Sequence, residues 1–475
     1  MAGIKSYGAY IPYYRMPRSV IGAAWGRGGG RGELAIAGYD EDSVSMSVSA
    51  GIDCLKGTDP HTVDAIYLAT TTPPYIERLN SNIVSNALDF RRDVRNADFG
   101  NGLRAGVSAL MAAVDAVNAG SLKSVLVTAS DLRMGVPGGE HENTLGDGAA
   151  AFLVADDAVA VEVEGSLTYS DDLADYWRMT GDEFIRSWED RFGRDAGYSQ
   201  IPVEVVKNLL GKLNLTPKDI SKACVAGANT RAQTGLARAM GFAPEQVQDA
   251  QLDDVGNTGV AQPLMILIAA LEDAKPGERF LMVSWGTGCD AVVLKTTDQI
   301  EKIKDRRAIK RHLAIKATLD NYGKYMRWRD VVPTQIRARG GISMSAEWRE
   351  RKLGLALYGV KCLNCGTVQL YMRGSSMRAH ICVECQAKDN FEPYRFSDKT
   401  GKVVTFSHDF LGGGINPPMT RAVVDFEGGG RGLFDLVDRD PEECKVGMDV
   451  EMTFRMTRTA DNAKSYFWKI KPVRE

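Results

Sequence analysis

The sequence predicts an α/β protein made of one duplicated unit, followed by a small metal-binding module and a small β-barrel. An Asp-x-Gly-Asn turn occurs at 98–101 and again at 254–257, and each copy precedes an Ala-rich, helix-like run. Two Cys-x2-Cys pairs follow, and short strand-like runs separated by Gly-rich turns close the chain. Repetition at this scale indicates that one supersecondary unit was duplicated. Two facing halves would share one cleft, where function should be sought.

Residues 1–165 are predicted to form the first half. Short Val-, Ile- and Leu-rich runs alternate there with longer amphipathic runs, the pattern of strands buried between helix layers. Runs 65–70 and 124–130 are expected to be strands on either side of the first Asp-x-Gly-Asn turn and its helix. We expect Asp98 and Asp254 to cap the helices that follow them, because aspartate commonly accepts hydrogen bonds from the first amides of a helix.

Residues 166–330 are predicted to form the second half, which begins with an inserted cap. Residues 166–200 are polar and aromatic and resemble an insertion more than a core segment. The strand pattern of the first half then recurs at 223–227 and 279–284. A Gly-x-Gly turn ends each half, and in the second half it lies at 286–288.

Composition and charge narrow the class of protein. A chain of 475 residues is too long for one ordinary core. A formal net charge of −3 gives no electrostatic case for nucleic acid or an anionic membrane as a partner. No apolar run is long enough to span a bilayer, and the first residues lack a signal-peptide pattern. Eight cysteines are too few for a disulfide scaffold, so a reducing, cytoplasmic compartment is expected.

The strongest local motif is a pair of cysteine knuckles, Cys362-x2-Cys365 and Cys382-x2-Cys385. Two such knuckles complete a tetrahedral four-sulfur shell that suits Zn²⁺. With four protein ligands the metal has no open position, so its role should be structural. The alternative interpretation is two disulfides or free thiols.

The segments around the knuckles predict a linker and a β-barrel. Val332-Pro333 and residues 337–341 have linker composition. Three short strands are expected beyond the knuckles, at 401–407, 420–425 and 450–455, a spacing typical of a small barrel. The barrel shows no basic stripe interleaved with aromatic residues, so a nucleic-acid-binding barrel is disfavoured.

Several stretches resemble archaeal-type hydroxymethylglutaryl-CoA synthases of the thiolase superfamily. These stretches are 39–46, 137–144, 256–258, 271–279 and the motif Tyr322-x2-Tyr325-x-Arg327. The chain from about Trp348 resembles the zinc-ribbon/OB-fold proteins that accompany acyl-CoA thiolase-like subunits. The resemblance implies a duplicated, five-layered thiolase-like fold, then a linker and zinc ribbon at 331–395 and an OB-fold barrel at 396–475. It also implies a homodimer or a thiolase-like partner protein.

The residues that carry catalysis in that family are missing. The family acylates a cysteine, and Leu103 occupies the matching place. An alkyl side chain cannot attack a thioester, so the nucleophile position is vacated. The family's histidine should lie in a His-x-x-Asn motif, where this chain has Ala226-Gly-Ala-Asn229. Its glutamate should precede a Pro-Tyr pair, where this chain has Thr71-Thr-Pro-Pro-Tyr75. The resemblance therefore does not predict hydroxymethylglutaryl-CoA synthase activity.

Four residues are candidates for catalysis. Asn257 matches the family's catalytic asparagine, whose amide binds a carbonyl or enolate oxygen. Tyr75 is the first candidate base, because thiolase-like steroid side-chain aldolases lack the cysteine and are thought to use tyrosines for proton transfer. Tyr75 also fits a loop aromatic packed behind two prolines. His141 and Glu142 precede the Gly-x-Gly turn at 146–148, and a solvated loop is the competing interpretation for both.

Four further residues are candidates for substrate binding. They are Asn229, Gly286, Gly288 and Cys289. The surroundings of Cys289 offer no base or positive charge to lower its pKa, so a buried inert thiol is the competing interpretation. The Gly- and Arg-rich run at 25–32 lacks the ending of a phosphate-binding P-loop and fits a surface loop better.

The function expected from these residues is an acyl-CoA carbon–carbon lyase or aldolase, or the reverse condensation, with a CoA thioester as substrate. Retro-aldol cleavage needs a base for the β-hydroxyl and a donor for the enolate oxygen, and it needs no acyl-enzyme. The alternative is a non-catalytic thiolase-like scaffold that binds acyl-CoA and supports an active partner.

Overall fold

The computed structural model forms two compact units. The first comprises residues 1–38, 42–85 and 90–322, and the second comprises 39–41, 86–89 and 323–475. The structure describes residues 1–332, 344–371, 380–411, 415–457 and 463–474. The predicted linker at 337–341 lies outside the described residues.

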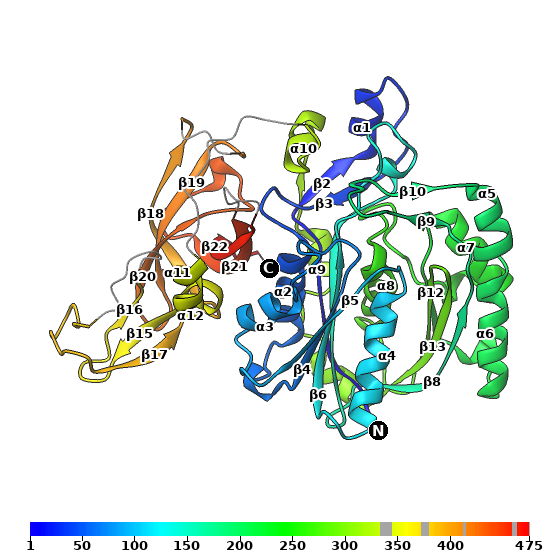
Figure 1. The fold of residues 1–475 in the computed structure, drawn as a ribbon, viewed down its shortest axis with the longest axis horizontal. Coiled ribbons are helices and arrows are strands. Elements are labelled where there is room, and N and C mark those ends of the chain that lie inside the picture. The colour runs from blue at the N-terminus through cyan, green and yellow to red at the C-terminus, as the bar shows by residue number, and fades with distance from the viewer. Residues whose placement is uncertain (333–343, 372–379, 412–414, 458–462, 475) are drawn as a thin grey trace. The chain divides into compact units, whose positions relative to one another are not determined.

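A nine-stranded mixed sheet runs through the first unit (Figure 1). Its first half contains β1 (Gly3–Tyr10), β4 (Ala65–Ala69), β5 (Arg95–Phe99), β6 (Ser124–Asp131) and β7 (Gly148–Ala155). Its second half contains β8 (Val161–Ser170), β11 (Lys222–Val225), β12 (Arg279–Trp285) and β13 (Gly288–Thr296). The order across the sheet is β11-β12-β13-β8-β1-β7-β6-β4-β5.

The strand pairing shows the duplication directly. The pair β4 and β6 is parallel, and so is the pair β11 and β12. Next to each of these lies an antiparallel neighbour, β7 beside β6 and β13 beside β12. The next strand is antiparallel in each half, β1 beside β7 and β8 beside β13, and β1 and β8 pair with each other in the middle of the sheet. The two halves share strand order and direction, which confirms the predicted duplicated fold.

Four helices complete the layers of the first unit. Figure 1 shows α4 (Ala105–Asn118) and α8 (Gln262–Leu271) in the middle, with α2 (Ser43–Cys54) and α6 (Ile201–Lys212) on the two outer sides. The helices α4 and α8 contact each other, while α2 packs on β1 and β7 and α6 packs on β8 and β13. Every residue of α8 is buried, as expected for a helix that is apolar all round. The first-half strands and the second-half strands of the sheet lie on either side of α4 and α8 in Figure 1, so the order helix, strands, helices, strands, helix gives five layers.

The predicted helix caps at Asp98 and Asp254 were wrong. The Asp98 carboxylate accepts hydrogen bonds from the backbone amides of Asn80 (2.7 Å) and Ser81 (2.9 Å), so it caps α3 (Ser81–Ala87) instead. Neither α4 nor α8 has a side-chain cap. The cause is distance along the chain, because several residues separate each aspartate from the helix that follows it.

The predicted cap at 166–200 is shorter than expected. Strand β8 continues in the sheet to Ser170, and the remaining residues leave it. They include the two-stranded pair β9 (Tyr176–Trp177) and β10 (Arg186–Ser187) and end in helical turns before α6. This remainder supplies one side of the cavity described below.

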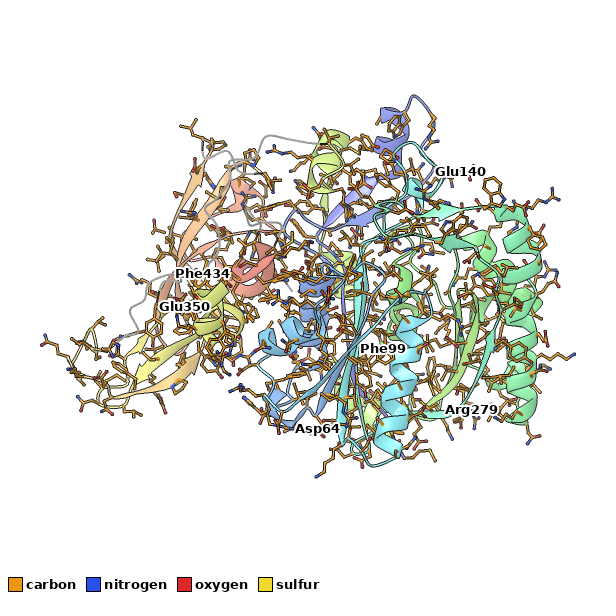
Figure 2. The ribbon with its side chains drawn as sticks, viewed as in Figure 1. Asp64, Phe99, Glu140, Arg279, Glu350 and Phe434 are labelled. Carbon is orange, nitrogen blue, oxygen red and sulfur yellow. The ribbon has the colours of Figure 1, made fainter. Side chains whose placement is uncertain are left out.

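The second unit contains a five-stranded barrel. Its strands are β18 (Thr400–Asp409), β19 (Met419–Phe426), β20 (Arg431–Asp435), β21 (Asp449–Thr457) and β22 (Ser465–Pro472), in the order β20-β19-β18-β21-β22. A bridge between Leu436 and Ile470 joins the two edges. Inside, Phe434 (labelled in Figure 2) packs edge-on against Phe426 with ring centroids 5.7 Å apart. The three strands predicted at 401–407, 420–425 and 450–455 lie in β18, β19 and β21.

A small ribbon precedes the barrel in the second unit. Strands β15 (Tyr358–Cys362), β16 (Val368–Gln369) and β17 (Phe391–Arg395) form a sheet in the order β16-β15-β17. The short helices α11 (Met344–Arg349) and α12 (Arg351–Ala356) come directly before it. Within the described part of the chain, no helix has the length and apolar character needed to cross a membrane.

Candidate functional site

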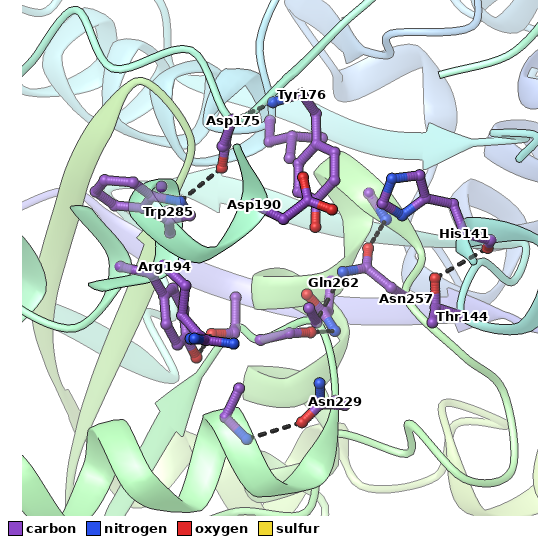
Figure 3. A pocket seen from close by; sticks show the side chains of 18 of the residues that line it. His141, Thr144, Asp175, Tyr176, Asp190, Arg194, Asn229, Asn257, Gln262 and Trp285 are labelled. Carbon is purple, nitrogen blue, oxygen red and sulfur yellow. Dashed lines mark hydrogen bonds between the residues drawn. The ribbon is translucent and has the colours of Figure 1, made fainter. Parts of the chain in front are cut away.

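A cavity of about 250 Å³ lies in the first unit and collects residues from both halves. Leu103 comes from the first half, and the loop at 226–229 and the turn at 257–263 come from the second. The cap adds Asp175 and Tyr176. Figure 3 shows Asp175, Asn229 and Asn257 reaching the cavity from separate elements. The cleft expected between the duplicated halves is therefore present.

Two side-chain amides fix one wall of the cavity. The Gly227 carbonyl accepts hydrogen bonds from Asn257 Nδ2 (3.3 Å) and Gln262 Nε2 (2.9 Å). The Asn257 Oδ1 accepts from the Gly259 amide at 2.9 Å, which sets the orientation of its side-chain amide. An amide nitrogen carries two hydrogens, so Asn257 Nδ2 keeps one donor for a ligand oxygen.

Asn229 lines the cavity and also begins a helix. Its Oδ1 accepts a hydrogen bond from the Ala232 amide at 2.9 Å and so caps α7 (Thr230–Ala239). The family histidine expected in this loop is absent, and the loop presents the small residues 226–228 and the Asn229 amide to the cavity.

His141 also lines the cavity, as one of the predicted catalytic residues. Its Nε2 lies 2.8 Å from the Ser187 Oγ, and its ring meets Tyr176 edge-on with centroids 5.2 Å apart. Burial lowers the pKa of the imidazole, and the nearby Asp190 only partly opposes this effect. A neutral imidazole in a cavity is a competent proton acceptor.

Glu142 does not face the cavity, although it follows His141 directly. Its buried carboxylate accepts hydrogen bonds from the Gly138 amide (2.8 Å) and the Tyr322 hydroxyl (2.5 Å). The same Tyr322 oxygen accepts a hydrogen bond from Trp25 Nε1 at 3.1 Å. Glu142 therefore anchors the loop that carries His141, and its carboxylate is already engaged. Trp25, in the Gly- and Arg-rich run, belongs to this anchor.

Leu103 lines the cavity, and the next residue, Arg104, binds the turn at 286–288. Arg104 donates to the carbonyls of Gly286 (2.9 Å) and Thr287 (3.2 Å) and to the Asp290 carboxylate (2.8 Å). A Cβ at Gly286 would lie 2.9 Å from the Leu103 Cβ. Glycine at 286 therefore leaves room for the Cβ of residue 103.

Besides Glu142, four residues predicted to bind or react with substrate lie outside the residues that line the cavity: Tyr75, Gly286, Gly288 and Cys289. Tyr75 lies in an irregular segment, with the Arg78 guanidinium 4.7 Å from its ring centroid. Gly288 is required by the backbone, because its φ is 116° and a Cβ would meet the Tyr169 oxygen at 2.2 Å. Cys289 is buried in an apolar cluster that raises the pKa of its thiol, and thus an inert thiol fits the structure better than a reactive one.

The sequence did not single out several cavity residues. Asp175 Oδ2 accepts from Trp285 Nε1 at 2.7 Å, and burial raises the pKa of this carboxyl. Burial, and then the nearby Asp175, raises the pKa of the Tyr176 hydroxyl. Tyr198 donates to the Ala226 carbonyl at 2.8 Å. The aromatic and acidic composition of the cap was the available signal, but it gave no direction for any side chain.

The four predicted metal ligands come together in the second unit. The sulfurs of Cys362, Cys365, Cys382 and Cys385 all lie within 4.8 Å of one another. Each knuckle has the same backbone pattern, in which the amide of the first cysteine donates to the residue five positions later, Thr367 or Ala387. All four cysteines are free, so two disulfides are not present. This arrangement fits a four-thiolate metal shell.

Two family models match separate parts of the chain. The model of the 3-oxoacyl-[acyl-carrier-protein] synthase III C-terminal domain matches residues 210–296. The model of the ChsH2 C-terminal OB-fold domain matches residues 394–455. These ranges fall in the second half of the duplicated fold and in the barrel.

Curated relatives cover about two thirds of the chain. A hydroxymethylglutaryl-CoA synthase of Caldivirga maquilingensis is 32% identical over 343 residues, which is 70% of this chain and 98% of the relative. A hydroxymethylglutaryl-CoA synthase of Methanopyrus kandleri is 31% identical over 335 residues, 68% of this chain and 95% of the relative.

Solved structures share the fold at lower identity. A hydroxymethylglutaryl-CoA synthase in complex with CoA matches 72% of this chain and 94% of that chain, with a TM-score of 0.64 and 17% identity. The 3-oxoacyl-[acyl-carrier-protein] synthase III of Aquifex aeolicus matches 62% of this chain and all of that chain, with a TM-score of 0.54 and 22% identity.

Proposed function

The chain belongs to the hydroxymethylglutaryl-CoA synthase family of thiolase-like acyl-CoA condensing enzymes, and from this premise we propose that it cleaves or forms a carbon–carbon bond in a CoA thioester without a cysteine acyl-enzyme. The observation that carries the proposal is the composition of the cavity. Leu103 lines it where the family's nucleophile is expected, and none of the cysteines in the described residues lines it.

The remaining cavity residues support retro-aldol chemistry. In this reaction a base removes the proton from the β-hydroxyl of a β-hydroxyacyl-CoA, the bond between Cα and Cβ breaks, and the Cβ fragment leaves as an aldehyde or ketone. The electron pair moves toward the thioester carbonyl as an enolate, which is then protonated to a shorter acyl-CoA. His141 is the proposed base, and the remaining Asn257 Nδ2 hydrogen is the proposed donor to the enolate oxygen.

His141 takes the role first expected of Tyr75. His141 lines the cavity and is held there by Ser187, whereas Tyr75 is absent from the lining residues. Glu142 becomes a positioning residue for the His141 loop, because its carboxylate is engaged by Gly138 and Tyr322.

Two ligands follow from the proposal. The CoA complex of a solved relative supports CoA as part of the substrate. The four-cysteine cluster would hold one structural Zn²⁺, which supplies stability to the ribbon and leaves no coordination position for substrate. A homodimer remains part of the proposal by resemblance.

A second candidate function is a non-catalytic scaffold that binds acyl-CoA and supports an active thiolase-like partner. The vacated nucleophile position favours it, since a subunit without chemistry could keep the fold and the cavity. The presence of an imidazole and an available amide donor in one cavity favours the lyase instead.

Turnover by the purified chain alone tests the proposal. The protein is incubated with β-hydroxyacyl-CoA and β-ketoacyl-CoA panels, and release of acetyl-CoA or propionyl-CoA is followed by liquid chromatography and mass spectrometry. We expect release from at least one β-hydroxyacyl-CoA. Release that requires an added thiolase-like partner would support the scaffold and refute the lyase.

A further inference from the structure

Gln262 carries a buried side-chain amide that the folded chain uses only in part. It is the first residue of α8, it is 4% exposed, and it lines the cavity. Its Nε2 donates one hydrogen bond, to the Gly227 carbonyl, although an amide nitrogen carries two hydrogens. Among the described residues, this side-chain amide makes no other hydrogen bond. A buried N–H without an acceptor is unfavourable, so a ligand that supplies the acceptor would be bound.

Gln262 shares its acceptor with Asn257. The Gly227 oxygen lies 2.9 Å from Gln262 Nε2 and 3.3 Å from Asn257 Nδ2, and Figure 3 shows the two side chains next to each other. A carbonyl oxygen only accepts hydrogen bonds, so the nitrogen of each amide faces it rather than the oxygen. These two donors use both of its lone pairs, and therefore the second hydrogen of each nitrogen needs a different acceptor.

The two remaining hydrogens are placed to serve one ligand oxygen. Both nitrogens lie within 3.3 Å of the Gly227 oxygen, so they are close enough to each other for one further oxygen to accept from both. The Asn257 amide cannot turn over, because its Oδ1 accepts from the Gly259 amide at 2.9 Å. Both residues line the cavity. Two fixed amide donors around one position suit an oxygen that gains negative charge.

The surroundings of the two amides also favour such an oxygen. Gln262 begins α8, a helix of ten residues, and the N-terminus of a helix carries a partial positive charge. The neighbouring loop places Ala226 where the family's histidine is expected, and a methyl group offers no hydrogen-bond donor. Gln262 therefore supplies a donor that Ala226 does not.

We propose that Gln262 is a catalytic residue that acts with Asn257, and that the two side-chain amides bind the thioester carbonyl oxygen of the substrate and stabilise it as an enolate. This inference rests on the proposed function, because it concerns the same reaction in the same cavity. Negative charge grows on the thioester oxygen as the bond between Cα and Cβ breaks. Both hydrogen bonds then strengthen, and the transition state is stabilised more than the bound substrate.

Binding of two matched CoA derivatives tests the pair of amides without turnover. Acetyl-CoA and S-ethyl-CoA have the same length and differ only in the carbonyl oxygen. Calorimetry with the full chain should show acetyl-CoA bound about 5- to 100-fold more tightly, the range of two buried hydrogen bonds. Gln262→Met keeps the side-chain length and removes the donors, so it should reduce this preference about 2- to 10-fold. Equal binding of the two compounds by the unaltered chain, or a preference unchanged in Gln262→Met, would overturn the inference.

Gln246→Met is the matched control. Gln246 also donates through Nε2 to backbone carbonyls, those of Pro217 (2.8 Å) and Ile220 (2.6 Å), but it lies outside the residues that line the cavity. The control should keep the acetyl-CoA preference of the unaltered chain. A preference lost equally in both variants would refute a specific role of Gln262.

Infrared spectroscopy of bound acetyl-CoA, labelled with ¹³C at the carbonyl, tests the same contact in the unaltered protein. The thioester C=O band should lie at a lower frequency than in water, because two fixed amide donors polarise the carbonyl. A band at or above the frequency in water would contradict the proposal, whether or not the variants fold.

Steady-state kinetics separates this inference from the proposed function. On the best β-hydroxyacyl-CoA of the panel, Gln262→Met should lower kcat by about 10²- to 10³-fold, the usual loss for one such donor. Lyase turnover that Gln262→Met leaves unchanged would keep the lyase and remove the role of Gln262. An acetyl-CoA preference that depends on Gln262, in a protein without turnover, would keep the carbonyl-binding pair and remove the lyase.

Discussion

Replacing Cys382 with serine is expected to release the bound metal and unfold the ribbon formed by β15, β16 and β17. Cys382 is buried, and its sulfur lies 3.5 Å from that of Cys365 in the four-cysteine cluster. The ribbon has few residues with which to bury a core of its own. Structural Zn²⁺ contributes about 10–16 kcal/mol to folding in small motifs, far more than a ribbon of this size can supply by packing.

Metal analysis and hydrogen exchange measure this loss together. The unaltered chain should carry about one zinc ion per chain, and Cys382→Ser should carry none and lose exchange protection at 358–371 and 380–395. Protection within residues 1–322 should not change. Cys444→Ser is the control, because Cys444 lies in the second unit outside the knuckles. Full metal content in Cys382→Ser would show that the cluster is not a metal site.

Replacing His141 with alanine is expected to lower kcat of the proposed lyase by about 10²- to 10⁴-fold, the usual contribution of a general base. The loss should fall on kcat more than on KM, because the imidazole acts on the proton that moves in the reaction. Tyr75→Phe is the control, since Tyr75 does not line the cavity, and its kcat should stay within about twofold. Steady-state kinetics on the best substrate of the panel gives both values.

The pH dependence of kcat should report the protonation of His141. Burial lowers the pKa of His141 below the ordinary value near 6.5. The base is active when neutral, so activity should persist at pH 6.5 and fall along an acidic limb below it. The free energy of unfolding should also fall as the pH falls, because the unfolded chain binds the His141 proton more tightly than the folded chain does. The contribution of His141 to stability is present above about pH 6.5 and is lost as the pH falls. An acidic limb unchanged in His141→Ala would contradict the assignment.

The duplicated fold was predictable because its signal is periodic. The Asp-x-Gly-Asn turns and flanking apolar runs occur twice, and the paired strands follow the same order in both halves. The cysteine cluster was predictable because the geometry of a knuckle is local, and the spacing alone brings two sulfurs together. Asn257 and Leu103 were placed through the turns that carry the family resemblance, and both line the cavity.

Side-chain direction in irregular segments was not predictable. His141 and Glu142 are neighbours in the chain, yet one lines the cavity and the other is tied to Tyr322. Short helical turns send adjacent side chains in different directions, which composition does not encode. The resemblance suggested Tyr75 as the base, but the tyrosines that line the cavity, Tyr176 and Tyr198, come from the cap. The cap has no counterpart in the first half, so the repeat could not predict where Tyr176 and Tyr198 lie.

The central claim is carbon–carbon chemistry on a CoA thioester with no covalent intermediate. Intact-protein mass spectrometry of the chain during steady-state turnover, with release of acetyl-CoA or propionyl-CoA measured in the same samples, tests it most directly. We predict that the shorter acyl-CoA accumulates while the protein keeps its unmodified mass. A stoichiometric acyl adduct that forms and decays at the rate of turnover would contradict the account.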